Sequence, residues 1–342
     1  MRYLGNSLDH LACSVMGFRD WPPRNELSNF YQAARGQTNG DPISWRMGLS
    51  LLQAIATNKT VLVTTGEYEQ KAFERGETDG PVGIAVLSRT LTGLGCNVVF
   101  VSDPRLLEIH RAVVDSFVGT SLEYAEFPGG EDFDYRALAA SIIEKFDCSV
   151  LIACEKLGRN SAGEYHDASG RNCSADENRV DYLFDLAYEQ QRLTLAFGDR
   201  GNEIGFGSID KVARAVSPFG RTCNCPCKQG IIATTKTTYL LPSTVSNWGA
   251  IALADMLAAL SDRPDLVHTA GRQHWLQDLL LKHEVIDGVL LSVSRSVDSI
   301  EGDVDLAIVK IMEASTMRSL TTRDAYFEAK GAPQEDIVIC QE

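Results

Sequence analysis

Hydrophobic and polar positions along the chain predict strands and helices in alternation. Short β-branched apolar runs occupy 60–66, 96–102 and 148–155, and runs of this kind are typical of buried strands. Apolar residues with helical spacing lie between them, at 81–95 and 134–146. Strands that alternate with such helices predict βαβ units and a mainly parallel sheet covered on both faces. We therefore expect a three-layer αβα sandwich of the Rossmann-like α/β class.

The rest of the chain extends this pattern, apart from its first part. We expect further helices at 105–117, 178–191, 247–260, around His274 and at 303–314, and further strands or extended runs at 121–128, 192–198, 231–243 and 287–294. Residues 1–55 resemble a helical cover, and no repeat or low-complexity linker divides the remaining residues. The sequence therefore predicts a helical N-terminal extension, 1–55, packed on a single α/β domain, 56–342.

The composition is that of a folded globular protein, and its charge limits the partners to expect. Apolar residues make up 44% of the 342 positions and the formal net charge is −14. An acidic average surface disfavours nucleic acids and anionic membranes, and no apolar run approaches the roughly 18 residues that span a bilayer. The nine cysteines are mostly dispersed, and the N-terminus lacks the pattern of a signal peptide, which favours the cytoplasm. We expect a small amino or carboxylic acid as the partner and leave a homodimer open.

Polar segments with glycine follow several predicted strands or extended runs. They are TTGE (64–67), SDP (102–104), CEKLGRN (154–160), GDRGNE (198–203) and TVSNWG (244–249). Each alone is equally compatible with an ordinary turn. In an open parallel sheet, however, the carboxyl ends of the strands lie at one edge, where ligands bind. Together, these segments predict one shared cleft.

The segment GDRGNEIGFG (198–207) is the most informative of them. Its glycines permit tight turns at a helix start, where free N–H groups attract anions. Asp199, Asn202 and Glu203 add two carboxylates and an amide within five residues. Such a set could orient an ammonium group, coordinate a hard divalent cation, or act as base and acid. The alternative is a capped helix start in which Asp199 and Asn202 only satisfy backbone donors.

Two other segments carry candidate substrate contacts. The loop ERGETDGPVG (74–83) holds Glu77, Thr78 and Asp79 ahead of a helix, and its alternative interpretation is an exposed helix cap. Glu155 leaves the end of a buried strand, with Arg159 close by. A planar guanidinium suits a carboxylate, although a surface ion pair explains Arg159 equally well.

The cysteines and histidines give weaker signals. Cys223, Cys225 and Cys227 are spaced more tightly than the usual zinc knuckle, and no second paired cluster follows them. Reduced loop thiols are therefore favoured over a zinc site. The histidines are dispersed, and His166 alone lies in a motif-bearing loop. The P-loop, G-x-G-x-x-G and G-x-S-x-G motifs are absent from the sequence, so nucleotide and serine-hydrolase interpretations lack support.

These motifs resemble the D-glutamate cyclase C-terminal-type domain family. The similarity rests on TTG (64–66), ETDGPVG (77–83), Ser102-Asp103, Glu155 to Arg159, GDRGNEIGFG (198–207) and VSNWG (245–249), in the family's order from about residue 60 to 260. Arg200 stands where the family has glycine. The segment after Arg159 keeps Gly163, Tyr165, Gly170 and Arg171 but replaces an Asp and an Asn, for which Glu164 or His166 could compensate. Larger relatives join this domain to a second cyclase domain.

The resemblance implies a hydro-lyase that converts D-glutamate to 5-oxo-D-proline and water without a required cofactor. It implies Asp199 or Glu203 as the base and Glu155 as the acid, with Asn202 or Asn247 and the N–H groups near Gly201 stabilising the oxyanion. Arg159 or Lys156 would hold the α-carboxylate. The substrate-binding set it implies is Thr65, Gly66, Glu77, Thr78, Asp79, Arg159, Gly201, Ser246 and Asn247.

Two alternatives from other classes stay open. One is a metal-dependent enzyme acting on another small amino or carboxylic acid, in which Asp199, Glu203 and Asp79 hold Mg²⁺ or Mn²⁺. The other is a module that binds an amino acid without catalysis.

Overall fold

The chain folds around one parallel sheet, as the computed structural model shows for residues 1–16, 25–70, 72–130 and 133–321. Its strands are β1 (Thr60–Thr65), β2 (Asn97–Ser102), β3 (Glu123–Glu126), β4 (Val150–Cys154), β5 (Leu193–Gly198) and β6 (Tyr239–Pro242). They pair in parallel in the order β3-β2-β1-β4-β5-β6. This is the strand order of doubly wound Rossmann sheets, so the predicted fold class is confirmed.

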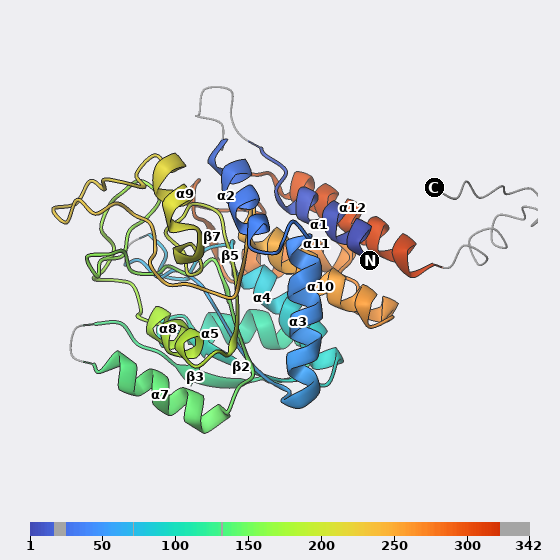
Figure 1. Ribbon diagram of the computed structural model, residues 1–342. Coiled ribbons are helices and arrows are strands. Elements are labelled where there is room, and N and C mark those ends of the chain that lie inside the picture. Colours follow the sequence, from blue (N-terminus) through green and yellow to red (C-terminus); the bar gives the residue numbers. More distant parts are fainter. Residues whose placement is uncertain (17–24, 71, 131–132, 322–342) are drawn as a thin grey trace, which may run out of the picture.

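Helices connect and cover the strands (Figure 1). In chain order they are α1 (Arg2–Ala12), α2 (Asn25–Gly36), α3 (Ile43–Thr57), α4 (Pro81–Gly93), α5 (Leu107–His110), α6 (Ser116–Val118), α7 (Tyr135–Phe146), α8 (Asp181–Glu189), α9 (Asp210–Val216), α10 (Ser246–Leu260), α11 (Ala270–Lys282) and α12 (Gly302–Leu320). A π-helical turn, Arg111–Asp115, joins α5 to α6. In the described part of the chain, no helix is both long and apolar enough to span a bilayer.

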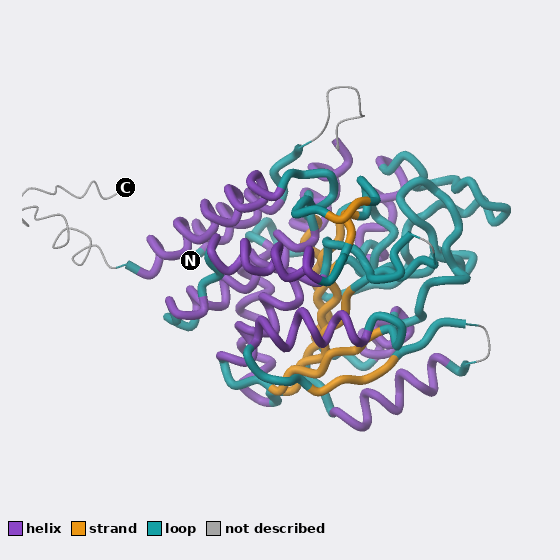
Figure 2. The backbone as a smooth tube through the Cα atoms, turned by 180° about the vertical axis from the view of Figure 1, so that it is seen from behind, coloured by secondary structure: helices purple, strands orange, loops and turns teal. Residues whose placement is uncertain are grey.

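The helices are distributed unevenly over the two faces. Helices α3 and α4 each pack on α10 and against the sheet. Helices α1 and α12 also pack on α10, and α11 packs on α12. Helix α7 pairs with α8, which packs on β5. Figure 2 shows most helices on one side of the sheet and long loops over much of the other. Helix α10 is apolar on all sides and buried from Ser246 to Ala259, which is typical of a helix enclosed by other helices.

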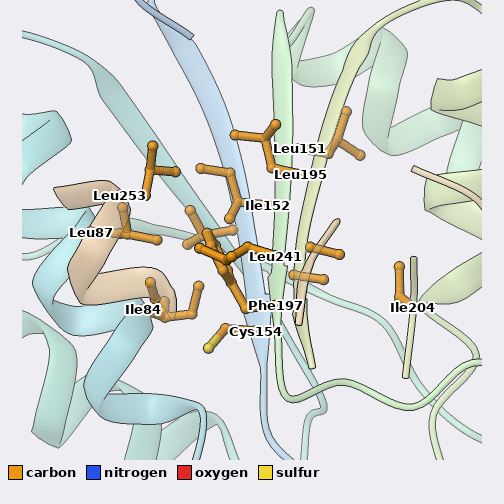
Figure 3. Packing of buried hydrophobic residues seen from close by; sticks show 14 of the residues in the cluster. Ile84, Leu87, Leu151, Ile152, Cys154, Leu195, Phe197, Ile204, Leu241 and Leu253 are labelled. Atoms are coloured by element: carbon orange, nitrogen blue, oxygen red, sulfur yellow. The ribbon is translucent and has the colours of Figure 1, made fainter. Parts of the chain in front are cut away.

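The hydrophobic core lies between the sheet and this helical layer. Ile152 of β4 and its partner Leu195 of β5 share the face of the sheet that is covered by Leu87 of α4 and Leu253 of α10, whereas Leu151 points to the other face (Figure 3). These side chains are buried on both faces of central strands, which is why the strands read as continuous apolar runs in the sequence. The helices predicted for the first 55 residues exist as α1–α3, although 17–24 and 322–342 lie outside the described residues.

The strand register places the predicted polar segments at one edge. Thr65 pairs with Cys154, Cys154 with Phe197, and Gly198 with Pro242, so four neighbouring strands end at the same level. The strand order also reverses between β1 and β4. Ligands of open α/β sheets bind at such a switch point, outside the carboxyl ends of the strands.

Two predicted extended segments differ from the structure. The strand expected at 287–294 is wrong: the residues form a small hairpin of β7 (Ile286–Asp287) and β8 (Ser292–Val293) around an exposed turn. The apolar residues 289–291 follow the pattern of a strand, but they lie in the turn of this hairpin and outside the main sheet. In the extended run at 231–243, only β6 is a strand. Two long segments, 155–180 and 217–238, contain neither helix nor strand.

Candidate active site

A cleft of about 470 Å³ opens at the carboxyl edge of the sheet. Its charged and amide lining consists of Glu67, Glu69, Glu77, Glu155, Asp167, Asp199, Asp298, Arg171, Arg200 and Asn202, and its remaining lining of Ala72, Phe73, Ala168, Ser169, Gly288, Val289 and Leu291. Of the five predicted strand-tip segments, those after β1, β4 and β5 line this cleft, whereas SDP (102–104) and TVSNWG (244–249) contribute no lining residue. Seven carboxyl groups and two guanidinium groups make the cleft strongly acidic.

Beneath the cleft, Asp79 and Asn247 organise the starts of two helices. The Asp79 carboxylate accepts backbone N–H groups of Gly80, Ser246 and Asn247, each at 2.9 Å. The Asn247 amide oxygen accepts the N–H groups of Gly80 at 2.9 Å and Gly83 at 2.6 Å. Each side chain therefore satisfies N–H groups that a helix start leaves without partners. These two predicted substrate contacts have their polar atoms occupied by the protein backbone.

Glu155 stands at the tip of β4 and faces the cleft. Its backbone has φ of +45°, a left-handed conformation that is uncommon for a residue with a side chain. The Ser246 hydroxyl donates a hydrogen bond to its carboxylate. Burial raises the pKa of Glu155 well above its usual range, and the nearby charge of Asp199 raises this pKa further. Its surroundings therefore shift Glu155 toward its protonated form.

The turn after β5 brings Asp199 to the same place, and Glu203 holds that turn together. The Glu203 carboxylate accepts the N–H groups of Asp199 at 2.7 Å, Arg200 at 2.8 Å and Gly201 at 2.7 Å. Carboxylate oxygens of Glu155, Asp199 and Glu203 all lie within 4.8 Å of one another. Because Glu203 is fully buried and bound by three N–H groups, it is better suited to positioning than to proton transfer.

Further carboxyl groups extend the acidic surface of the cleft. Burial raises the pKa of Glu67 to about 8, with Glu177 contributing and Lys156 opposing the shift. Burial also raises the pKa of Glu77 well above its usual range, assisted by Glu67 and Asp298. These acids therefore retain protons more readily than isolated carboxyl groups, as expected where like charges cannot all ionise.

The cations that reach the cleft are different from those the sequence suggested. Arg159 pairs with Asp181 and Asp185 and stacks on Tyr182, and it does not line the cleft. Lys156 is buried, with Nζ donating to the Gly66 carbonyl oxygen at 2.6 Å and pairing with Glu177. Neither cation is placed to hold a carboxylate in this cleft.

Arg171 and Arg200 line the cleft instead. The Arg171 guanidinium binds both carboxylate oxygens of Glu69, at 2.7 and 2.6 Å, and also Asp167. Arg200 contacts Asp199 through Nε at 3.1 Å, and no other ion pair of Arg200 occurs within the described ranges. Among the described residues that line the cleft, Arg200 is therefore the cation with guanidinium nitrogens left for a ligand.

The other predicted site residues support the cleft from below or beside it. Thr65 ends β1, and its hydroxyl lies only 2.1 Å from where a Cβ on Gly80 would be, so glycine is required there. Gly66 has φ of +90°. The Asn202 amide donates to the His166 carbonyl oxygen at 2.9 Å, while its own buried oxygen has no hydrogen-bond partner among the described residues. Thr78 and Gly201 contribute backbone groups to these turns.

Sequence reasoning missed several residues that line the cleft. Glu67 lies in the predicted strand-tip segment TTGE (64–67), but it is not among the predicted site residues. Asp167 and Arg171 lie in the loop after β4, and Asp298 has φ of +50°, which no sequence pattern indicated. The 286–298 segment reaches the cleft through Gly288, which abuts the Glu77 carboxylate.

The predicted divalent-cation set is only partly assembled. Of Asp199, Glu203 and Asp79, the last two already accept three backbone N–H groups each. The carboxylates that come together in the cleft are those of Glu155, Asp199 and Glu203. Oxygen atoms of this kind suit Mg²⁺ or Mn²⁺. A cation there would be held mainly by Glu155 and Asp199.

The fold and the cleft define an α/β protein with an acidic site at the sheet's switch point, and the comparisons assign its family. The family model described as "D-glutamate cyclase-like, C-terminal" matches residues 42–313, and the chain belongs to this family. A human relative named "D-glutamate cyclase, mitochondrial" is 27% identical over 261 residues. The match covers 68% of this chain and 40% of the relative, so the chain spans less than half of that protein's length. The expected cytoplasmic location stays a prediction.

Proposed function

We propose that the chain is a D-glutamate cyclase-type lyase that converts D-glutamate to 5-oxo-D-proline and water. The observation that carries this proposal is the pairing of Glu155 and Asp199 at the tips of adjacent strands. Their carboxylate oxygens lie within 4.8 Å, and the pKa of Glu155 is raised well above its usual range. A carboxyl group with a raised pKa beside a second carboxyl group is the kind of pair that can supply an acid and a base together.

The reaction needs a base at the α-amine. In an acidic cleft the substrate ammonium group is attracted, and Asp199 accepts one of its protons so that the neutral amine can attack. A new N–C bond then forms to the γ-carboxyl carbon. Since the Asp199 backbone N–H is fixed by Glu203 at 2.7 Å, the base is held in place by its own turn. Glu203 acts as a positioning residue in this mechanism.

The reaction also needs an acid at the γ-carboxyl group. Protonated Glu155 donates to the oxygen that leaves, and the C–O bond breaks as water forms. Over one cycle two protons leave the nitrogen and two reach the leaving oxygen, so the pair ends in its starting state. The Ser246 hydroxyl, bonded to the Glu155 carboxylate, orients the acid. The free guanidinium nitrogens of Arg200 would hold a substrate carboxylate.

The proximity of Glu155, Asp199 and Glu203 favours a second candidate, a metal-dependent enzyme acting on a small acid. In that case a Mg²⁺ or Mn²⁺ ion held by Glu155 and Asp199 would supply Lewis-acid chemistry. Both candidates use the same cleft, and they differ in whether the reaction needs a metal ion.

One assay tests the proposal and separates the two candidates. The purified chain is incubated with D- or L-glutamate, either after EDTA treatment or with added Mg²⁺ or Mn²⁺, and 5-oxoproline is measured by chiral chromatography and mass spectrometry. We expect the D-lactam in the EDTA-treated sample. Activity only with added metal would favour the second candidate. Thermal stabilisation by glutamate with no lactam in any sample would identify a binding module and overturn both.

A further inference from the structure

We infer that the chain contains a structural zinc site formed by Cys223, Cys225, Cys227 and His166. The three thiol sulfurs and the His166 ring nitrogen all lie within 4.8 Å of one another. Three thiolates and one imidazole are a standard ligand set for structural zinc. His166 lies in another loop and precedes the cysteines by a long stretch of chain, which is why the spacing of the cysteines alone did not predict it.

The distances between ligand atoms, 3.2–3.7 Å, are close to the edges of a zinc tetrahedron and at most about half an ångström shorter. Cys223 Sγ lies 3.5 Å from Cys225 Sγ and 3.3 Å from Cys227 Sγ. His166 Nε2 lies 3.2 Å from Cys225 Sγ and 3.7 Å from Cys227 Sγ. Zn–S bonds of about 2.3 Å and Zn–N bonds of about 2.0 Å give tetrahedral edges of roughly 3.5–3.8 Å. The four atoms therefore enclose a space of the right size for one ion.

Neighbouring groups donate to the sulfurs in the way that a thiolate requires. The backbone N–H of Cys227 lies 3.4 Å from Cys225 Sγ, and the Asn160 amide lies 3.5 Å from Cys227 Sγ. Such donors orient the ligands and stabilise negative sulfur. His166, Cys223 and Cys225 are buried, so the site is closed to solvent on most sides. Four protein ligands leave no open position for a substrate, which indicates a structural rather than a catalytic ion.

The proposed zinc site would stabilise a part of the fold that lacks regular secondary structure. It joins the two long segments, 155–180 and 217–238, that contain neither helix nor strand. Long irregular segments inside a compact domain are uncommon and need local constraints. Hydrogen bonds also join them: Asn224 donates to the carbonyl oxygens of Ser169 and Gly170 at 2.7 and 2.9 Å, and Asn160 donates to the Gly230 carbonyl oxygen at 2.7 Å. A bound ion would add a strong cross-link at the centre of this contact.

The same cross-link would support one wall of the cleft. Asp167 and Arg171 lie just after His166 in the chain and line the cleft. On its other side, His166 offers its carbonyl oxygen to Asn202 of the GDRGNE turn at 2.9 Å. The zinc ligands therefore lie behind the active-site loop and hold it from outside. This inference concerns the ion's structural role and does not depend on the proposed cyclase activity.

Metal content of the full-length chain tests the site directly. We expect about one zinc per chain by plasma mass spectrometry after EDTA treatment and gel filtration. Cys225→Ser and His166→Ala should each reduce this at least fivefold, whereas Cys148→Ala, which removes a buried thiol elsewhere, should leave it unchanged. Zinc-free protein that also fails to give the visible absorption of tetrahedral thiolate-bound Co²⁺ on refolding would overturn the inference.

A measurement on the unaltered protein covers the case in which the variants do not fold. A mercurial reagent is titrated into the native chain while a chromophoric chelator reports released zinc. Complete release in step with modification of three thiols is the expected result. Zinc that EDTA removes before any thiol reacts would be an adventitious ion, and a mass two hydrogens lower would show a disulfide in the cluster. Either result would overturn the assignment.

Discussion

Asp79, which lies just before α4, caps the start of α10, and Asn247, which lies in the first turn of α10, caps the start of α4. The Asp79 carboxylate binds N–H groups at the beginning of α10, and the Asn247 amide oxygen binds N–H groups at the beginning of α4. Both side chains are almost fully buried. The two helices that pack behind the site are thus fixed to each other through their first turns. This contact also helps to position the strand ends above them.

This reciprocal arrangement predicts a large and coupled loss of stability. Asp79→Ala or Asn247→Ala leaves two or three buried N–H groups without an acceptor, so each should lower the free energy of unfolding by about 2–4 kcal/mol. The double variant should lose less than the sum, since each cap needs the other helix in place. Urea denaturation measures all three. Asp134→Ala removes an exposed cap of α7 and should cost only about 1 kcal/mol. Additive losses would show that the caps act independently.

The roles assigned to Asp199 and Glu203 can be separated by comparing activity with stability. Asp199→Asn should lower kcat about 10²–10⁴-fold while changing the free energy of unfolding little, because it removes a base but keeps the shape. Glu203→Gln places an amide NH₂ against backbone N–H groups and should cost about 2–4 kcal/mol of stability. Turnover and urea denaturation are measured on both variants. A stable Glu203→Gln variant with kcat reduced as strongly as in Asp199→Asn would make Glu203 the base.

Arg200 offers a prediction about substrate binding. If its guanidinium holds a substrate carboxylate in the ground state and the transition state alike, Arg200→Ala should raise KM about 10–100-fold with little change in kcat. Arg200→Lys should recover only part of this because an ammonium group cannot bind bidentately. Steady-state kinetics with D-glutamate measures both. Arg192→Ala, which alters an arginine outside the cleft, is the control. An unchanged KM in Arg200→Ala would remove Arg200 from the substrate contacts.

The fold was predictable from the sequence because its signals are local. Buried strands of a parallel sheet are apolar on both faces, and runs such as 148–155 show this without any knowledge of their neighbours. The convergence of strand-tip segments followed from the same topology. The 287–294 error has a related cause: an apolar run that packs in a short exposed hairpin looks the same as one that enters a sheet.

The chemical roles within the site were less predictable because they depend on partners distant in the sequence. Arg159 looked suited to a carboxylate, but it is occupied by Asp181 and Asp185 of the following helix. The assignment of Glu203 as a base ignored the backbone N–H groups of its own turn, which only the folded geometry reveals. His166 joins the cysteines across two loops, and a spacing pattern cannot show such a contact.

The buried carboxyl group of Asp255 in α10, which lies outside the cleft, should make the stability of the protein depend on pH. Burial raises its pKa to about 7, while its carboxylate accepts the His268 N–H at 2.8 Å and the Thr316 hydroxyl at 3.1 Å. The folded state therefore keeps a proton between about pH 4 and 7 that the unfolded chain has lost. Stability from this group is complete below about pH 4, falls as pH rises, and levels off above about pH 7. Glu313 adds to the shift. Burial lowers the pKa of the neighbouring His268 to about 4, so this histidine contributes a stability change of opposite sign between about pH 4 and 6.5.

Asp255→Asn removes this titration while keeping a neutral side chain of the same shape. Its unfolding free energy relative to the original chain should therefore increase by about 2–3 kcal/mol between pH 5 and pH 8, at 1.36 kcal/mol for each unit of pH up to about 7. Urea denaturation at pH 5, 6, 7 and 8 measures the difference, in which contributions from all other titrating groups cancel. Asp115→Asn, which changes a partly exposed carboxylate that also accepts hydrogen bonds, serves as the control. Parallel stability curves for the Asp255→Asn variant and the original chain would show that Asp255 is already ionised in the folded protein at pH 5.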